Sequence, residues 1–269
     1  MSNIEEAILR HGARGMDVLK EYMPENFCEL ATKALYELNR GTILLATGFY
    51  VAGFTETDGP LGTLTLALAL KKLGFNSVIV TDTYSKDCFE KYGVETVYVP
   101  LDADNDYLSN LFESYSPVGL VSIERCGKNI RGKYENMRGV DIGEYTAPVD
   151  ELFIIAKEKN IPTWGVGDGG NEIGMGNLKD IITDKLSLTP CRVEVDYLVI
   201  ATVSNWGAYG ITGYLEKFSG EQLKPEFDWA KEYLAFTSEL GSLDGVNKTK
   251  TITVDGLPIE YEEEAWNLR

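Results

Sequence analysis

Short runs of apolar, β-branched residues alternate along the chain with longer stretches of helical periodicity. The short runs predict strands over 43–51, 77–82, 95–101, 118–124, 163–167 and 193–202. Amphipathic or apolar stretches of helical length lie between them, over 61–73, 85–92, 107–115, 148–159 and 206–218. The strands are apolar on both faces, as expected when crossover helices cover both sides of a sheet. We therefore predict an α/β fold with a mostly parallel, twisted sheet in a Rossmann-like, three-layer arrangement.

The two ends of the chain add further elements to this pattern. Helices are expected over 5–22 and 27–39, ahead of the first strand. After Gly220 come a helix over 227–240 and a strand-like segment over 249–254. The sequence contains no internal repeat, low-complexity tract or proline-rich linker. We expect a single domain over 1–269, with the segment 1–40 packed on it as an N-terminal helical extension.

The composition excludes several classes of protein. Hydrophobic residues make up 44 % of the chain, enough for a large core, so intrinsic disorder is excluded for most of it. The 42 acidic residues outnumber the 25 basic ones and give a formal net charge of −17. Such an excess repels phosphate backbones and anionic membranes, so neither nucleic acid nor a membrane is an expected partner. The sequence leaves open whether the protein forms a homo-oligomer.

Cysteine and histidine limit the chemistry further. The four cysteines lie far apart and the one histidine is His11, which excludes a zinc site built from paired Cys and His ligands. The cysteines are expected to be reduced thiols, and the chain lacks a signal-peptide core or a membrane-length apolar run, so a cytoplasmic protein is expected. Acid–base chemistry is expected from carboxylates, Tyr, Lys or a bound ion.

The residues with candidate chemistry follow the predicted strands. In open α/β sheets ligands bind at the carboxyl ends of the strands, so loops at these places are expected to form one site. After the first strand, Asp58-Gly59-Pro60 predicts a helix start with Asp58 near the cap. The free N–H groups there, including that of Gly59, suit a ligand carboxylate. The pattern leaves open whether Asp58 acts in chemistry or only caps the helix.

Two further strand ends carry charged and aromatic residues. Glu124 and Arg125 follow the fourth strand and should face different ways, so that one could enter the site while the other forms an ion pair; a purely structural role is the alternative. Arg138 and Asp141 lie in an irregular polar segment that would suit a lid, with Arg138 as a bidentate partner for a carboxylate. Asn205 and Trp206 at the last helix start would supply an amide and an aromatic wall. Surface exposure of Arg138 and core packing of Trp206 are the alternatives.

The fifth strand runs into a glycine-dense loop. Residues 165–170 formally match G-x-G-x-x-G, but the loop follows a late strand and Asp168 would stand where a pyrophosphate should lie. Neither a nicotinamide nor a flavin cofactor is therefore expected. A loop with Asp168, Asn171 and Glu172 among glycines better suits an ammonium group or a hard cation such as Mg²⁺ or Mn²⁺. The N–H groups of Gly169 and Gly170 would also suit an anion.

These loops together resemble a known family. The motifs 56–60, 124–127, 136–142, 146–148, 167–176, 204–207 and 241–246, in this order, resemble the D-glutamate cyclase-like C-terminal domain over nearly the whole chain. The resemblance implies a lyase, a hydro-lyase of amino-acid metabolism, since the characterised eukaryotic member is mitochondrial and converts D-glutamate to 5-oxo-D-proline with loss of water. The implied ligand is a small molecule, a glutamate-like amino acid.

Such a cyclisation would need a base, an acid and anchors for carboxylates. Asp168 or Glu172 is the candidate base for the substrate ammonium, and Glu124 or Asp58 the candidate acid. Arg125, Arg138 and the loop N–H groups are candidate anchors. Two alternatives stay open: a metal-assisted hydrolase or lyase with oxygen ligands from Asp58, Asp141, Asp168 and Glu172, and a non-catalytic module that binds an amino acid.

Overall fold

Six parallel strands form the central sheet of the computed structural model, which describes residues 4–12 and 14–268. The spatial order is β5-β4-β1-β6-β7-β8, and every neighbouring pair is parallel. The strands span β1 Thr42–Ala46, β4 Asn76–Thr81, β5 Glu95–Tyr98, β6 Gly119–Ile123, β7 Thr163–Gly167 and β8 Tyr197–Ile200. Strands β1, β6 and β7 are buried along almost their whole length because helices cover both faces of the sheet.

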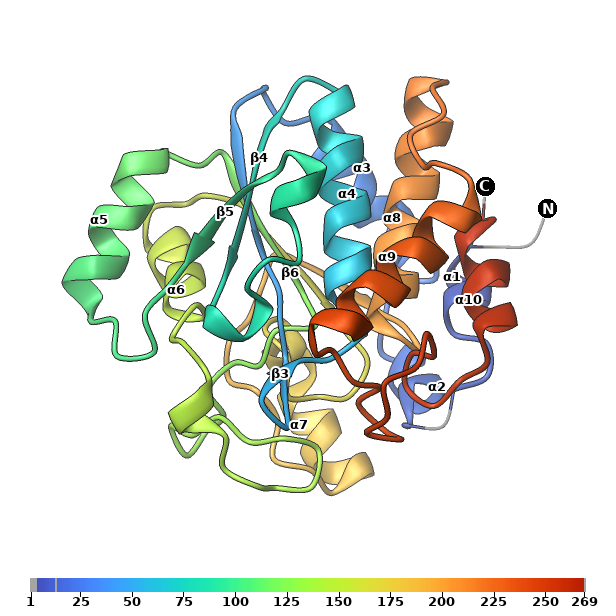
Figure 1. Cartoon of the computed structure of the whole chain (residues 1–269). Helices are drawn as coiled ribbons and strands as arrows, with labels where there is room; N and C mark the ends of the chain where they lie inside the picture. Colours follow the sequence, from blue (N-terminus) through green and yellow to red (C-terminus); the bar gives the residue numbers. More distant parts are fainter. Residues whose placement is uncertain (1–3, 13, 269) are drawn as a thin grey trace.

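Helices lie on both faces of this sheet (Figure 1). One face carries α5 (Asn105–Tyr115) and α6 (Glu151–Glu158), while the other carries α3 (Phe27–Tyr36), α4 (Pro60–Lys72) and α8 (Ser204–Ser219). The helix α9 (Phe227–Leu240) packs on α4, and α1 (Ile4–Ile8) and α10 (Ile259–Trp266) pack on α8. The predicted α/β class, with helices on both faces of a parallel sheet and extra N-terminal helices, is thus confirmed.

Most element bounds agree with the sequence pattern, and β7 and α9 agree to the residue. The predicted helix over 5–22 is wrong as a continuous element. The chain forms α1 and the separate α2 (Met16–Lys20), because His11 and Gly15 adopt left-handed backbone conformations with φ of 61° and 82°. Residue 13, within that prediction, lies outside the described residues.

Four other predictions need correction. The strand expected over 43–51 stops at Ala46, and Tyr50–Val51 (β2) instead pairs with Phe54–Thr55 (β3) in a small antiparallel hairpin. The strand expected over 193–202 shortens to β8. The helix expected over 85–92 is two 3₁₀ turns, Thr83–Ser85 and Glu90–Tyr92, and residues 249–254 make only an isolated bridge through Val254.

Two segments that the pattern did not resolve also have structure. A run of short helical turns follows β7, comprising Met175–Leu178, α7 (Lys179–Ile181) and the π-helical Ile182–Leu186. A further 3₁₀ turn spans Gly143–Tyr145. These turns are too short for a periodic pattern to identify them.

The strand order reverses beside β1, which positions the site. The chain passes from β1 outward to β4 and β5, then crosses back to β6 on the other side of β1. The loops that leave β1 and β6 therefore diverge at the carboxyl edge of the sheet, where open α/β folds bind ligands. All four cysteines are free and buried. In the described part of the chain, no helix combines the length and apolarity needed to cross a membrane.

Candidate active site

Three acidic side chains from three different loops meet at the carboxyl edge of the sheet. Asp58 follows the β2–β3 hairpin, Glu124 follows β6 directly, and Asp168 follows β7 directly. Each offers a carboxylate oxygen, and these oxygens lie within 4.8 Å of one another. All three side chains are buried, with 5 % exposure or less. The fold thus places three acidic groups together at buried positions.

Asp58 is held by the start of α8 rather than by its own helix. Its Oδ2 accepts the Ser204 N–H at 2.8 Å, and its Oδ1 accepts the N–H groups of Asn205 at 2.7 Å and Gly59 at 2.8 Å. The side chain of Asn205 reaches back, and its Oδ1 accepts the N–H groups of Gly59 at 3.0 Å and Gly62 at 2.8 Å. The two side chains therefore cap each other's helices, α8 and α4, across the site. The expectation that Asp58 caps the helix beginning at Pro60 is corrected accordingly.

This reciprocal capping also uses the N–H groups at the start of α4 that the sequence analysis predicted to bind a ligand. The Gly59 N–H, predicted to bind a carboxylate, donates to Asp58 and Asn205 instead. Gly59 has φ of 93°, and a Cβ there would lie 2.7 Å from the Cβ of Glu124. Glycine is thus required by both the backbone conformation and the close approach of Glu124.

Glu124 occupies an unusual backbone conformation. Its φ is 48°, in the left-handed region that a non-glycine residue rarely adopts. The Ser204 hydroxyl donates to its Oε2 at 2.6 Å. Strain at this place turns the side chain into the carboxylate cluster. The next residue, Arg125, points elsewhere.

Arg125 is buried beside the cluster and serves the fold. Its Nη1 lies 2.6 Å from Asp82 Oδ2 and donates to the Gly48 carbonyl at 2.7 Å, while Nη2 donates to the Ala147 carbonyl at 2.8 Å. It fastens three loops together and is not among the described residues that line the main cavity. A substrate-anchoring role for Arg125 is therefore not carried into our proposal.

A different arginine, which the sequence analysis missed, reaches the cluster. Arg14 lies 2.7 Å from Asp168 Oδ1 through Nη1 and 2.9 Å from Asp255 Oδ1 through Nη2. Asp168 Oδ2 and Asp255 Oδ2 are buried without a donor, and the two side chains are within hydrogen-bonding reach of each other. A proton shared between these carboxyls would satisfy both oxygens.

The glycine loop places Glu172 and Asn171 beside the cluster of Asp58, Glu124 and Asp168. We call this buried acidic surface the floor of the site. The Gly170 N–H donates to Glu172 Oε2 at 2.7 Å, and the Asn171 side chain donates to the Glu135 carbonyl at 2.8 Å. A Cβ on Gly169 would lie 2.7 Å from Glu172 Oε1 and 3.2 Å from Asn171 Oδ1. The N–H of Gly170 is thus used by the protein's own carboxylate rather than left for an anion.

Burial holds protons on this cluster. It raises the pKa of Glu124 well above the usual range, and the neighbouring Asp168 and Glu172 carboxylates raise it further. Burial is also the first cause that raises the pKa of Asp58, Glu56, Glu172 and Asp255. For Asp168, burial outweighs the opposing effect of Arg14 and raises the pKa to about 7. Six acids thus face one arginine, and the floor holds protons or binds a cation.

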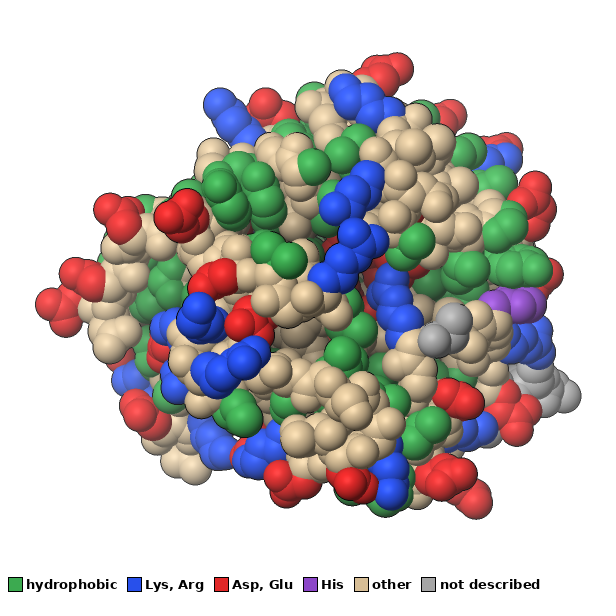
Figure 2. Space-filling view, turned by 90° about the horizontal axis from the view of Figure 1, so that it is seen from below, with side chains coloured by type: hydrophobic (Ala, Val, Ile, Leu, Met, Phe, Trp, Pro, Cys, Tyr) green, Lys and Arg blue, Asp and Glu red, His purple; other side chains and the backbone are tan. Residues whose placement is uncertain are grey.

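A cavity of about 390 Å³ opens above the floor and connects it to the surface. Glu56, Glu124, Asp168 and Glu172 line its acidic side, with Arg14. Lys and Arg side chains run across the middle of the face formed by the strand ends, which Figure 2 shows. Arg138 and Lys248 also line the cavity. Both are exposed, so they lie at its mouth, and neither side chain has an acidic partner within the described residues. The cavity therefore combines a negative floor with a positive mouth.

Three other residues proposed from the sequence lie away from the floor. Asp141 lines the mouth, where it is exposed and forms an ion pair with Lys133 at 3.1 Å. A hydrogen bond from the Gly143 N–H lowers the pKa of Asp141 below its usual range, and Lys133 lowers it further. Trp206 is buried, and its Nε1 donates to Glu262 at 2.5 Å. It packs in the core, so the predicted aromatic wall is corrected. Asn205 supports the cluster through its capping role.

The C-terminal loop supplies the remaining site residues that sequence reasoning missed. Asp244 accepts N–H groups of Val246 and Asn247 through Oδ1, and the Thr253 hydroxyl and the Gly256 N–H through Oδ2. This fixes the loop that carries Lys248 to the cavity and Asp255 to Arg14. Asp255-Gly256 is a turn signal that could have been found, but no local pattern shows which part of the site it reaches.

The fold and the floor define a class: an α/β protein with a proton-holding carboxylate cluster at the switch point of a parallel sheet. The chain belongs to the family described as D-glutamate cyclase-like, C-terminal, whose model matches residues 4–267. The sequence is 31 % identical over 279 aligned positions to the mitochondrial D-glutamate cyclase of Homo sapiens, covering 86 % of this chain and 45 % of that protein. The chain therefore spans a little under half the length of this relative.

A comparison with solved structures adds nothing to this assignment. A variant of the actinorhodin polyketide ketoreductase, solved with NADPH, aligns over 76 % of this chain and 67 % of its own at 13 % identity. The TM-score is 0.28. A likeness this slight carries no argument about ligand or activity.

Proposed function

We propose that the cavity is the active site of an enzyme that cyclises a glutamate-like amino acid to 5-oxoproline with loss of water. The observation that carries this proposal is the floor of buried carboxyls, whose pKa values burial raises, beneath a mouth where Arg138 and Lys248 have no acidic partner among the described residues. An amino dicarboxylate complements such a site, because its ammonium suits the floor and its carboxylates suit the mouth. Membership of the D-glutamate cyclase-like family supports the same activity.

The reaction requires the α-amine to lose a proton before it attacks the γ-carboxyl carbon. Asp168 is the candidate base, since its pKa of about 7 is close to neutral pH, and Glu172 is the alternative on the same floor. A new C–N bond forms and a C–O bond of the γ-carboxyl breaks. Glu124, whose pKa burial raises well above its usual range, is the candidate acid that protonates the departing hydroxide to water, with Asp58 as the alternative. The attacking nitrogen gives up a second proton as the lactam N–H forms, and this proton restores the acid.

The cations would position the substrate and stabilise developing negative charge. Arg138 and Lys248 at the mouth can hold carboxylates, and Arg14 lies beside the floor, where the oxyanion would form. Ring closure is intramolecular, so a site that holds the side chain folded supplies much of the rate acceleration by orientation alone.

Turnover of glutamate by the purified protein tests the proposal. We expect 5-oxoproline, detected by mass spectrometry, from one or both enantiomers of glutamate, and we expect Asp168→Asn and Glu124→Gln each to lower kcat about 100-fold or more. Glu144→Gln, at an exposed 3₁₀ turn, is the matched control and should retain activity. Absence of product with both enantiomers, with and without Mg²⁺ or Mn²⁺, would overturn the proposal. Thermal stabilisation by glutamate without turnover would instead favour a binding module.

A metal-assisted reaction is the second candidate, favoured by the three oxygens of Asp58, Glu124 and Asp168 within 4.8 Å. Oxygen donors at this spacing fit a hard divalent cation such as Mg²⁺ or Mn²⁺, which would polarise the γ-carboxyl as a Lewis acid. Calorimetric titration should then show stoichiometric binding that Glu124→Gln weakens and Glu144→Gln does not. Absence of binding at millimolar cation would exclude it.

A further inference from the structure

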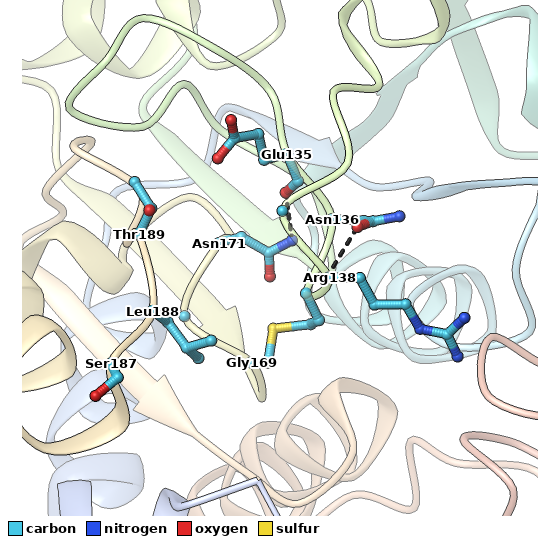
Figure 3. Close-up of a pocket in the computed structure, with 11 residues that line it drawn as sticks. Glu135, Asn136, Arg138, Gly169, Asn171, Ser187, Leu188 and Thr189 are labelled. Carbon is cyan, nitrogen blue, oxygen red and sulfur yellow. Dashed lines mark hydrogen bonds between the residues drawn. The ribbon is translucent and has the colours of Figure 1, made fainter.

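A second, smaller cavity of about 280 Å³ adjoins the main one. Figure 3 shows it between the turn at Asn136 and Arg138 and the segment Ser187–Thr189, with Gly169 and Asn171 lying between the two. The residues Ser187, Leu188 and Thr189 line this cavity but not the main one. It is therefore a compartment distinct from the one that the carboxylate cluster lines.

The two compartments share one wall. Asn136, Met137, Arg138 and Asn171 line both of them. The Met137 sulfur lies so close to the Gly169 backbone that a Cβ there would be 2.6 Å from Sδ. Methionine is unbranched and adaptable, so this contact forms a partition that a side-chain rotation can open. A ligand anchored on the acidic floor can thus extend into the smaller cavity.

One buried polar atom in the shared wall has no partner. Asn171 is 7 % exposed, its amide nitrogen donates to the Glu135 carbonyl, and its Oδ1 accepts nothing in the described structure. A buried acceptor without a donor costs free energy, so this oxygen calls for a ligand N–H or O–H. Arg138 lines the same wall, and its exposed side chain, which in Figure 3 extends away from Ser187–Thr189, can pair with a carboxylate here only by rotating toward the cavity. The compartment therefore suits a group with an N–H donor and an anionic end.

We propose that the smaller cavity is a leaving-group subsite, and that the protein also cyclises γ-glutamyl amides and peptides. This rests on the proposed function. The α-amine attacks the γ-carbonyl carbon, one C–N bond forms and the amide C–N bond breaks. The two protons that the substrate ammonium loses in becoming the lactam N–H pass through the floor to the departing nitrogen, which leaves as an ammonium group. The products are 5-oxoproline and the free amine or amino acid, and no water or further reactant is consumed. Asn171 Oδ1 accepts the N–H of the leaving group, and Arg138 pairs with its carboxylate.

Filling the subsite is the test. Leu188→Trp should lower kcat/KM for γ-glutamyl-alanine at least about 10-fold, because the added ring occupies the cavity, while turnover of glutamate stays within about twofold. Leu30→Trp, at a 44 % exposed position on α3, is the matched control and should change neither. Both enantiomers of the γ-glutamyl group are assayed, with the released alanine measured alongside 5-oxoproline.

The outcomes separate this inference from the proposal on which it rests. Turnover of glutamate without release of alanine, or equal loss of both activities in Leu188→Trp, would overturn the subsite and leave the cyclase proposal standing. If neither compound is turned over, the cyclase proposal fails, and calorimetric titration with γ-glutamyl-alanine decides the subsite. Binding weakened by Leu188→Trp and not by Leu30→Trp would support it, and binding equal in all three proteins, or none, would overturn it.

Discussion

Glu124 combines two costs at one residue. Its backbone is left-handed with φ of 48°, and its carboxyl is buried among other acids that raise its pKa. A residue chosen for stability alone would avoid both, since a strained φ and an unpaired buried acid each oppose folding. The conformation persists because Gly59 leaves room for its Cβ and Ser204 donates to its Oε2. Such a residue is a natural candidate for function.

Removing the charge of Glu124 should stabilise the protein. The pKa of Glu124 is higher in the folded than in the unfolded chain, so its contribution to stability is full below about pH 4.5 and is lost as pH rises. Glu124→Gln keeps the size and the acceptor for Ser204. At pH 8 we expect a gain on the order of 1–3 kcal/mol in the free energy of unfolding, and close to none at pH 4. Denaturant titration at both pH values measures it, with Glu144→Gln as the exposed control. A loss of stability at pH 8 would contradict this account.

Site residues could be predicted from the sequence where they directly follow a strand of the sheet. Glu124 and Asp168 follow buried strands directly, so the topology alone brings them to one edge. The arginines could not be assigned this way. The sequence pattern singles out Arg125 as a candidate anchor and gives no sign of Arg14, and only tertiary contacts show that Arg125 binds Asp82 while Arg14 reaches Asp168.

At the scale of elements, α4 and α8 depend on each other for their first turns. The cap residue positions of the two helices, Gly59 and Val203, provide no side-chain cap of their own. Asp58 and Asn205 supply the missing acceptors in exchange. Capping and site geometry are therefore one arrangement, since the same Asp58 carboxylate belongs to the acidic floor.

Asn205→Ala should loosen both the helices and the floor. The change leaves the buried N–H of Gly62 without an acceptor and removes a second acceptor from Gly59, and we expect a loss of about 2–3 kcal/mol in the free energy of unfolding. Asp104→Ala, which removes the exposed cap of α5 at Tyr107, is the matched control and should cost about 1 kcal/mol. Equal losses in both variants would show that the exchange across the site adds nothing to ordinary capping.

Elements were predictable in proportion to their length and burial. The strands β1, β6 and β7 and the helices α4 and α9 were found because each carries an uninterrupted apolar pattern. The segment 85–92 reads as a helix by composition, but residues 83–92 form two separate 3₁₀ turns. The sequence pattern did not predict α10, because its buried face, formed by Glu262, Ala265 and Trp266, includes an acid and so lacks a continuous apolar pattern. Burial of an acid such as Glu262, which Trp206 and Tyr209 satisfy, has no signature in the sequence.

At the scale of the whole molecule, segments from both ends of the chain close one site. Arg14 comes from the segment before α2, Asp168 from the middle of the chain and Asp255 from the loop before α10. Local pattern carries no information on such a contact, since more than 150 residues separate Arg14 from Asp168. One guanidinium thus compensates two acids that would otherwise repel each other, and joins three segments.

Arg14→Met should therefore destabilise the protein in a manner that depends on pH. At pH 8 it removes the counterion of the Asp168–Asp255 pair, so that the negative charge of the pair is buried without compensation, and we expect a loss of about 3–5 kcal/mol. At pH 5 the loss should be smaller, because the pKa of Asp168 is about 7 and that of Asp255 is also raised, so both already hold protons there. Denaturant titration at the two pH values measures the difference, with the exposed Arg10→Met as control. Adding Asp255→Asn to Arg14→Met should recover part of the loss at pH 8, since it removes one of the two carboxyls that can ionise. A loss independent of pH, or no recovery in the double variant, would mean that Arg14 acts by packing rather than by compensating these carboxylates.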